Sequence, residues 1–280
     1  MAVAAIIGAG PTGGAVAHAL ARRGMFARVL LVDDAIHVAA GKALDIQQAG
    51  PIEGFDTRLD ARPRPTDIGG ADLVIVADQA GPPAVEWQGE EGLAALSRVR
   101  QAGHEGPWLL AGASSAWLME RAAREIDLAP EKIVGSAVLA LQAALRAIVA
   151  LETDVSVLDV DALVVGRPPD SMRVLWEQAT VAGQPALSRL ARNGVHRIEH
   201  RLRQLWPPGP LALGSAAALT AHAMCRNARR RLTTFALVPA GAGERQALAV
   251  PALLGPAGVR AVETSLLEGQ PPWRFALARP

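Results

Sequence analysis

The feature that most constrains the fold of this chain is a glycine-rich turn near its start, Gly8-Ala9-Gly10-Pro11-Thr12-Gly13. The turn follows an apolar run over residues 2–7 that is typical of a buried strand, and it precedes a helical pattern over residues 15–23. An acidic residue, Asp33, stands 20 positions after Gly13, at the end of a second apolar run. Strand, turn, helix and acid in this order predict the first βαβ unit of a dinucleotide-binding sheet.

Within such a unit the glycines have separate roles. Gly8 allows the tight turn, Gly10 lets the backbone approach a pyrophosphate, and Gly13 lets the helix pack closely on the strand. The free N–H groups of the helix N-terminus bind the phosphates. Asp33 would accept hydrogen bonds from the adenine ribose and would repel a 2′-phosphate, which favours NAD over NADP. The alternative is a glycine turn that binds no ligand. The candidate cofactor-binding residues are Gly8, Gly10, Pro11, Thr12, Gly13 and Asp33.

Short β-branched runs alternate with helix-period stretches through the rest of the first half, which is the pattern of parallel βαβ units. Strands are predicted over residues 29–32, 73–77, 108–111 and 132–134. The other predicted elements are helices over residues 41–48 and 117–127, a turn at Gly50-Pro51, and a loop over the Gly-, Pro- and Glu-rich residues 79–92.

The second half has a different pattern. Its predicted elements are two short strands within residues 155–166, helices over residues 186–206 and 215–231, and a hairpin of residues 234–239 and 247–254. The expected fold class is therefore α/β, a doubly wound parallel Rossmann sheet over residues 1–140, followed by an α+β domain over residues 141–280.

Composition limits the possible environments and partners. The length of 280 residues corresponds to about two domains. A net charge of +1 gives no general attraction to nucleic acid or acidic membranes, and no run of 18 apolar residues is free of charge. The single cysteine, Cys225, fits a reducing compartment. We therefore expect a cytoplasmic protein that binds neither nucleic acid nor membrane. Its 50% apolar content favours a homodimer or homotetramer, and a further protein partner is left open.

The run over residues 6–54 resembles the lactate/malate dehydrogenase family through its segments IIGAGPTGGAVAHALARRG, VLLVDD and GKALDIQQAGP. The resemblance continues through ADLVIV, LAPEKIVGS, GRPPDSMRVLWEQATVAGQP and LAVPALLGPAGVRAVETSLLEG, and so extends over nearly the whole chain. It implies a Rossmann domain with an α+β substrate domain, an NAD cofactor, 2-hydroxy acid dehydrogenase chemistry, and a dimer or tetramer.

The same resemblance identifies catalytic positions at which this sequence departs from the family. The family's catalytic His lies in a G-E-H-G-D-S-like stretch, and here GRPPDS places Pro168 at the His position. The family's Asp and Arg lie in an L-D-S-x-R-like helix, where this chain has Leu141 and Ala144 respectively. A proline, a leucine and an alanine can neither take up a proton nor bind a carboxylate. No catalytic residue of the family is therefore expected at these positions.

Two further departures concern the loops. The family's mobile loop carries Arg residues that close over the substrate, whereas residues 79–92 contain Glu86, Glu90 and Glu91, which would repel an anionic substrate. The family also has a small T-A-G-like turn after the strand that ends near residue 76. Here Ala77-Asp78-Gln79 puts larger side chains and a carboxylate near the dinucleotide. NAD binding is therefore expected to be weak or lost.

These observations favour an NAD(H)-binding, lactate/malate dehydrogenase-like pseudoenzyme that serves as a binding, regulatory or structural subunit. The alternative is a divergent NAD-dependent oxidoreductase for a different substrate, with Arg167 or Asp170 as the nearest polar groups. A zinc hydrolase using the H-x-x-E-H pattern of His196 and His200 is disfavoured, because arginines surround the pattern and no third ligand is evident. No metal is expected, and Cys225 is expected to be a buried thiol.

Overall fold

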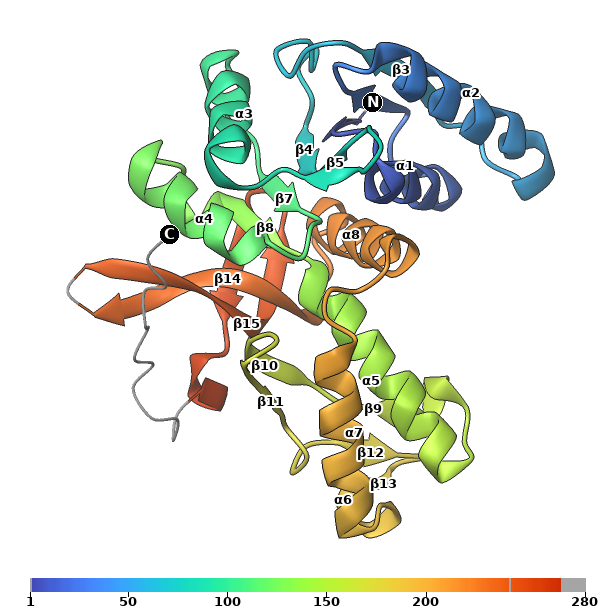
Figure 1. Ribbon diagram of the computed structural model, residues 1–280, viewed down its shortest axis with the longest axis vertical. Coiled ribbons are helices and arrows are strands. Elements are labelled where there is room, and N and C mark those ends of the chain that lie inside the picture. The colour runs from blue at the N-terminus through green and yellow to red at the C-terminus, as the bar shows by residue number, and fades with distance from the viewer. Residues whose placement is uncertain (1, 242, 268–280) are drawn as a thin grey trace.

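The computed structural model describes residues 2–241 and 243–267, and a large mixed sheet runs through the centre of this part of the chain (Figure 1). Six strands form its parallel region in the order β3-β2-β1-β4-β7-β8. These strands are β1 (Val3–Ile7), β2 (Arg28–Val32), β3 (Arg58–Arg62), β4 (Leu73–Val76), β7 (Trp108–Leu110) and β8 (Ile133–Gly135).

The second half of the chain extends the same sheet with antiparallel strands. β14 pairs with β8, and the order continues β14-β15-β10-β11, with β16 also paired to β15. These strands are β10 (Val164–Arg167), β11 (Ser171–Val174), β14 (Arg231–Gly241), β15 (Glu244–Gly255) and β16 (Gly258–Val262). Two smaller sheets contain β5 (Asp78–Gln79) with β6 (Val85–Glu86), and β9 (Val160–Asp161) with β12 (Thr180–Val181) and β13 (Gln184–Pro185).

Helices cover the parallel region and form a lobe at the lower end of the molecule in Figure 1, where α6, α7 and the far end of α5 lie beside the small sheet of β9, β12 and β13. The α-helices are α1 (Pro11–Arg23), α2 (Ile36–Glu53), α3 (Gly89–Gln101), α4 (Ser115–Glu125), α5 (Ala137–Thr153), α6 (Ala186–Arg189), α7 (Arg192–Gln204) and α8 (Pro210–Cys225). Short 3-10 turns are η1 (Pro130–Lys132), η2 (Val157–Asp159) and η3 (Thr264–Leu267).

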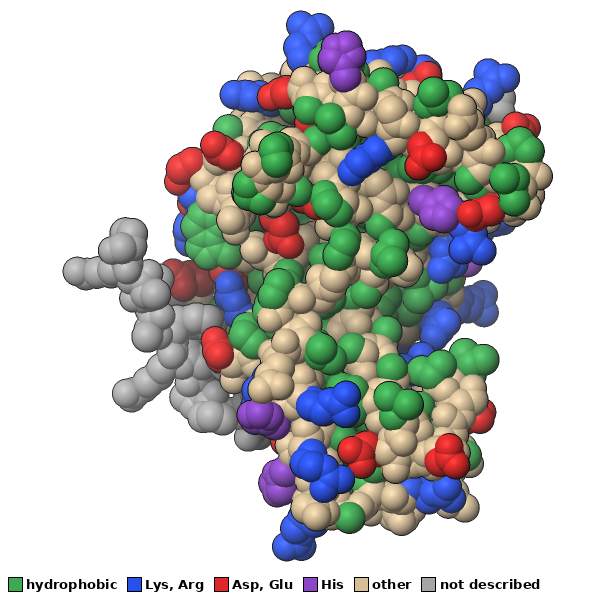
Figure 2. All heavy atoms as spheres, turned by 45° about the vertical axis from the view of Figure 1, so that its right-hand side comes forward, with side chains coloured by type: hydrophobic (Ala, Val, Ile, Leu, Met, Phe, Trp, Pro, Cys, Tyr) green, Lys and Arg blue, Asp and Glu red, His purple; other side chains and the backbone are tan. Residues whose placement is uncertain are grey.

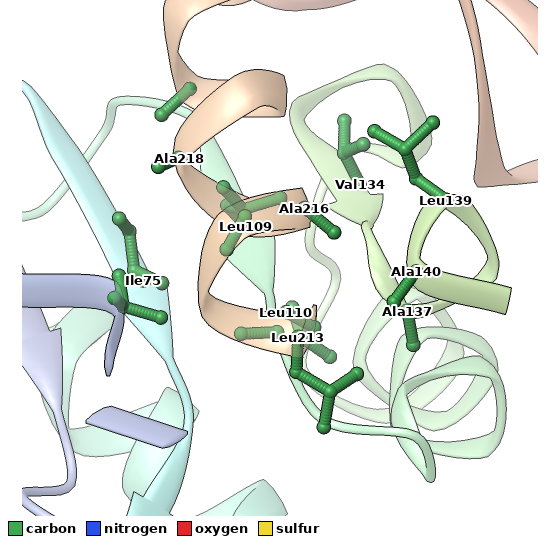
Figure 3. Close-up of a cluster of buried hydrophobic side chains, with 14 of the residues drawn as sticks. Ile75, Leu109, Leu110, Val134, Ala137, Leu139, Ala140, Leu213, Ala216 and Ala218 are labelled. Carbon is green, nitrogen blue, oxygen red and sulfur yellow. The ribbon is translucent and has the colours of Figure 1, made fainter. Parts of the chain in front are cut away.

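The central strands are apolar along their whole length because the sheet is covered on both faces, as parallel sheets require. Figure 3 shows part of this core, in which Ile75 and Leu109 of the sheet lie near Ala216 and Ala218 of α8. The alanines of α8 let it approach closely, and a side chain at Gly214 would collide with Ala15 of α1. Helix α8 of the second half therefore packs directly on the first helix of the Rossmann unit.

The α/β class and the parallel sheet expected from the sequence are confirmed, although several local predictions are wrong. Gly50 and Pro51 lie inside α2, which continues until Gly54 adopts the left-handed conformation and ends it. Residues 79–92 are not a loop, because they contain the β5–β6 hairpin and the start of α3. The helix expected over residues 186–206 is divided into α6 and α7 by extended backbone at Leu190 and Ala191.

The surface in Figure 2 carries basic and acidic side chains interspersed over its upper and lower parts. The helix predicted over residues 215–231 ends earlier, at Cys225, and Arg226, Arg229, Arg230 and Arg231 follow the end of α8. Cys225 itself is exposed, so the expectation of a buried thiol is wrong. None of the helices within the described ranges has both the length and the hydropathy needed to span a membrane.

Candidate functional site

The candidate site lies at one edge of the parallel sheet, where the carboxyl ends of β1, β4 and β7 meet. Because these strands are parallel and adjacent, the segments that follow them are brought together although they are far apart in sequence. Those segments begin at Gly8, Ala77 and Ala111. The segment after Gly8 leads to the N-terminus of α1, and the segment after Ala111 leads to the N-terminus of α4. The first N–H groups of each helix need an acceptor.

The glycine turn after β1 is packed against the backbone of β5. Gly8 has a φ of 106°, and a side chain there would collide with the carbonyl of Asp78. The Gly10 N–H donates a hydrogen bond of 2.9 Å to the same carbonyl oxygen. A side chain at Gly13 would collide with the carbonyl of Gly8. Gly8 and Gly13 are therefore required by close contacts with the backbone of the chain itself.

The carboxylate of Asp78 lies directly at the N-terminus of α1. Its Oδ1 accepts a hydrogen bond from the Gly13 N–H at 2.8 Å, and its Oδ2 accepts one from the Thr12 N–H at 3.0 Å. A Cβ placed on Gly10 would lie 2.5–2.7 Å from the atoms of this carboxyl group. Asp78 is only 5% exposed. Its side chain therefore fills the space that the absent side chain of Gly10 leaves open.

Asp33 lies beside the same turn and is also held by backbone N–H groups. Its Oδ2 accepts hydrogen bonds of 2.8 Å from Ala9 in the glycine turn and from Ala80, which follows β5. Its Oδ1 accepts one of 2.9 Å from Ala35. With 6% of its surface exposed, this carboxylate is directed into the protein.

A cation, Lys42 of α2, completes the arrangement. Its Nζ donates a hydrogen bond of 2.7 Å to the carbonyl oxygen of Gly10. Partial burial lowers the pKa of Lys42, while the charges of Asp78 and Asp33 oppose that change. The ammonium group therefore lies within the field of both carboxylates and partly balances them.

These contacts decide whether the candidate cofactor residues fit a dinucleotide. In that role the N–H groups at the start of α1 would face a pyrophosphate, and Asp33 would face the ribose hydroxyls. Here the N–H groups of Thr12 and Gly13 donate to Asp78, and Asp33 accepts from Ala80 of the hairpin that covers it. The structure brings Gly8, Gly10, Pro11, Thr12, Gly13 and Asp33 together as the motif requires, yet in this arrangement they do not fit a dinucleotide.

The second helix N-terminus at this edge, that of α4, is held in the same way. Glu86 of β6 accepts hydrogen bonds of 2.9 Å from Ala113 and from Ser114. The other acidic residues of this segment also have partners, since Glu90 forms an ion pair with Arg121 at 2.6 Å and Glu91 accepts from Gln79 at 3.4 Å. The three glutamates thus form contacts within the protein. The sequence analysis, which expected them to repel an anionic substrate, did not predict these contacts.

A cavity of about 570 Å³ lies beside α4 and the end of β10. Among the described residues that line it, Arg167 is the one charged side chain, and it forms an ion pair of 2.7 Å with Glu120. Glu120 also accepts a hydrogen bond from the backbone of Ala247. The full lining consists of Gln88, Gly89, Ala113, Ser114, Ala116, Trp117, Arg167, Pro168, Trp206 and Phe235. Six of these ten residues are apolar or aromatic.

Pro168, Leu141 and Ala144, which the family resemblance places at catalytic positions, differ in their burial. Pro168 is buried and lines the cavity. Leu141 is fully buried in α5, and Ala144 lies one turn further along the same helix, half-buried. Asp170, named as a possible polar group of a divergent site, is exposed beyond the end of β10.

The H-x-x-E-H pattern lies on α7, where His196 and His200 are exposed. Glu199 accepts a hydrogen bond of 2.9 Å from the Trp176 indole and so faces the protein. Within residues 2–241 and 243–267, no group of three His, Cys, Asp or Glu side chains is arranged to hold a metal ion.

Sequence reasoning noticed the carboxylate of Asp78 but not its partners, and it gave no role to Lys42 or to the contact of Glu86 with α4. Asp78 and Thr12 are 66 positions apart, and Glu86 and Ser114 are 28 apart. The available signal was the change from a small turn to Ala77-Asp78-Gln79, together with the rarity of lysine in this chain.

The fold and the glycine turn define a Rossmann-fold α/β protein. No family model matches the chain. The malate dehydrogenase of Thioalkalivibrio sulfidiphilus is 31% identical, in a match that covers 92% of this chain and 90% of that protein. The malate dehydrogenase of Xanthobacter autotrophicus is 33% identical, in a match that covers 94% of this chain and 88% of that protein.

Solved structures agree with these relatives. The malate dehydrogenase structure from Salinibacter ruber has a TM-score of 0.80 and 26% identity, and the match covers 93% of this chain and 88% of that one. A lactate dehydrogenase from a Medee basin deep-sea metagenome shares the fold, with a TM-score of 0.79, 19% identity, and coverage of 94% and 90%. The chain belongs to the lactate/malate dehydrogenase family.

Proposed function

We propose that this chain is a lactate/malate dehydrogenase family member without 2-hydroxy acid dehydrogenase activity, which serves as a binding, regulatory or structural subunit. The observation that carries the proposal is the chemistry of the 570 Å³ cavity. Pro168 lines it at the position that the resemblance gives to the catalytic His, and its one charged lining residue in the described chain, Arg167, is paired with Glu120.

Oxidation of a 2-hydroxy acid needs a base for the hydroxyl proton and a cation for the carboxylate. A positioned general base contributes roughly 10²–10⁴ in rate, and proline has no group that takes up a proton. A bidentate arginine supplies charge-assisted bonds and orientation, which the methyl group of Ala144 cannot supply. Leu141 is fully buried, and its side chain has no polar group that could orient a base.

The test is an assay of NADH absorbance at high protein concentration with malate, lactate, oxaloacetate and pyruvate. The malate dehydrogenase of Thioalkalivibrio sulfidiphilus, assayed in parallel, controls for the reagents. We expect a turnover at least about 10²-fold below that of the relative, since the base alone accounts for this loss. A turnover of about one per second, within the range of ordinary enzymes, would overturn the proposal. The same assay with alcohols and ketones that lack a carboxylate tests the alternative, and activity confined to these would favour a divergent oxidoreductase.

Assembly into a homodimer or homotetramer, and a cytoplasmic location, remain part of the proposal. The described surface supports assembly through large apolar side chains on two helices. Leu44 and Ile52 of α2 are 58% and 88% exposed, and Leu151 of α5 is 76% exposed. Burial of such side chains between subunits would remove apolar surface from water.

A further inference from the structure

We propose that the Asp78 carboxylate is an internal anion that takes the place of a dinucleotide pyrophosphate, so that the β5–β6 hairpin closes the cofactor site of this chain. The inference concerns the cofactor half of the site and rests on the family assignment. The proposed function rests on the other half, the cavity beside Pro168. The two can therefore fail separately.

The first argument is the position of the carboxylate. A helix N-terminus binds anions because its first N–H groups lack acceptors within the helix and its dipole is positive there. Asp78 accepts from the Thr12 and Gly13 N–H groups at 3.0 and 2.8 Å, in the geometry of charge-assisted hydrogen bonds. It also lies 2.5–2.7 Å from where a Cβ of Gly10 would be. The absence of a side chain at Gly10 thus lets the Asp78 carboxylate, and not a pyrophosphate, approach the backbone of the turn.

The second argument is that the hairpin carrying Asp78 is fixed at several independent points. The Asp78 carbonyl accepts from the Gly10 N–H, and the Ala80 N–H donates to Asp33 at 2.8 Å. At the far end of the hairpin, Glu86 accepts from the N–H groups of Ala113 and Ser114. Withdrawal of Asp78 to admit a phosphate would break or distort these contacts together.

The third argument is charge. A pyrophosphate brings two negative charges to a place that already holds the buried carboxylates of Asp33 and Asp78. Lys42 lies in the field of both and donates to the Gly10 carbonyl. Its positive charge therefore partly balances the carboxylates of Asp33 and Asp78 and is not free for a phosphate. A dinucleotide would therefore meet repulsion where the glycine turn ordinarily offers attraction.

The closed arrangement lowers the apparent affinity for a dinucleotide by the fraction of molecules that are open. The experiment is a titration with NADH, followed by its fluorescence, and with inorganic pyrophosphate, followed by the thermal unfolding midpoint. It compares the unmodified chain with Asp78→Ala, which frees the two N–H groups, and with Asp78→Asn, which keeps the shape and removes the charge. Glu86→Ala is the matched control, because it removes a carboxylate from the same hairpin without freeing the α1 N-terminus.

We expect no saturable binding of NADH by the unmodified chain up to millimolar concentration. For Asp78→Ala we expect NADH to bind about tenfold more tightly or better. The apparent affinity rises in proportion to the fraction of molecules whose cofactor site is open, and the substitution should raise that fraction by at least this factor. Pyrophosphate should raise the unfolding midpoint of Asp78→Ala more than that of Glu86→Ala, which loosens one end of the hairpin but leaves Asp78 on the α1 N–H groups. Asp78→Asn should lie between the unmodified chain and Asp78→Ala.

Saturable micromolar binding of NADH by the unmodified chain would overturn the inference, and without turnover it would leave the proposed function intact. A folded Asp78→Ala that binds neither probe would also overturn it, as would equal restoration of binding by Glu86→Ala. Hydrogen exchange in the unmodified chain is a further test that needs no variant. The Thr12 and Gly13 N–H groups should be protected without ligand, and 1 mM NADH (about the upper limit of the titration) should not slow their exchange further. Added protection by NADH would contradict the proposal.

Discussion

The two halves of the candidate site, the glycine turn (the cofactor half) and the cavity beside Pro168 (the substrate half), differ in how they are filled. At the glycine turn the chain supplies Asp78 as the acceptor of the backbone donors. The cavity beside Pro168 is open space, and six of its ten lining residues are apolar or aromatic. The difference follows from where the polar groups reside. A side chain is lost by substitution, whereas a backbone N–H group persists in every substitution except proline and still needs an acceptor.

The largest effect on stability is expected in the substrate half, from Leu141→Asp. Leu141 is fully buried, so the variant places a carboxylate without a described partner in the apolar core. We expect the free energy of unfolding to fall by about 3 kcal/mol or more, the range for an uncompensated buried charge. Denaturant unfolding measures the change. Ala144→Asp, on the same helix and half-buried, is the matched control and should cost much less. A cost for Leu141→Asp as small as that expected for Ala144→Asp would show that the substrate half tolerates a polar residue at position 141.

In the cofactor half, Gly13→Ala should also be costly, because its Cβ would collide with the rigid Gly8 carbonyl. We expect a loss of about 1–3 kcal/mol in the free energy of unfolding, as for other overpacked positions. Gly14→Ala is the matched control, since its Cβ would meet the flexible Lys42 side chain at 3.3 Å. That variant should be near neutral, or stabilising by up to about 1 kcal/mol through helix propensity. A neutral Gly13→Ala would mean that the turn is not packed as described.

The smallest expected effect concerns β7, the strand between the two halves. His104 precedes this strand and contacts Trp108 edge to face, with ring centroids 4.9 Å apart. Burial lowers the pKa of His104 below its ordinary value of 6.5. The unfolded chain therefore binds more protons than the folded one between the folded pKa and 6.5, and stability rises with pH across that window.

His104→Gln should flatten this dependence, which unfolding midpoints measured from pH 5 to 7.5 would detect. His37→Gln, the same substitution at an exposed position, is the control. An unchanged slope in His104→Gln would show that this imidazole is protonated as readily in the folded chain as in the unfolded one.

Local patterns in the sequence were sufficient where the structure depends on neighbours along the chain. The strands around residues 3–7 and 28–32 and the helix after the glycine turn follow from apolar periodicity and turn chemistry. Prediction was wrong at Gly50-Pro51, where α2 continues, and at residues 79–92. β3 was missed because Arg58, Asp60 and Arg62 interrupt its apolar pattern. Its place at the edge of the sheet tolerates those charges.

The sequence by itself determined the family, the α/β class and the residues of the glycine turn, because each of these depends on residue types at short spacings along the chain. That Leu141, Ala144 and Pro168 stand where the family resemblance places catalytic side chains is a prediction from residue type at given positions. Only the tertiary structure decided what the turn binds. Asp78 reaches Thr12 and Gly13 because β4 lies beside β1 in the sheet, which brings residues 66 positions apart into hydrogen-bond distance. A hydrogen bond depends on distance in space, and strand pairing sets that distance.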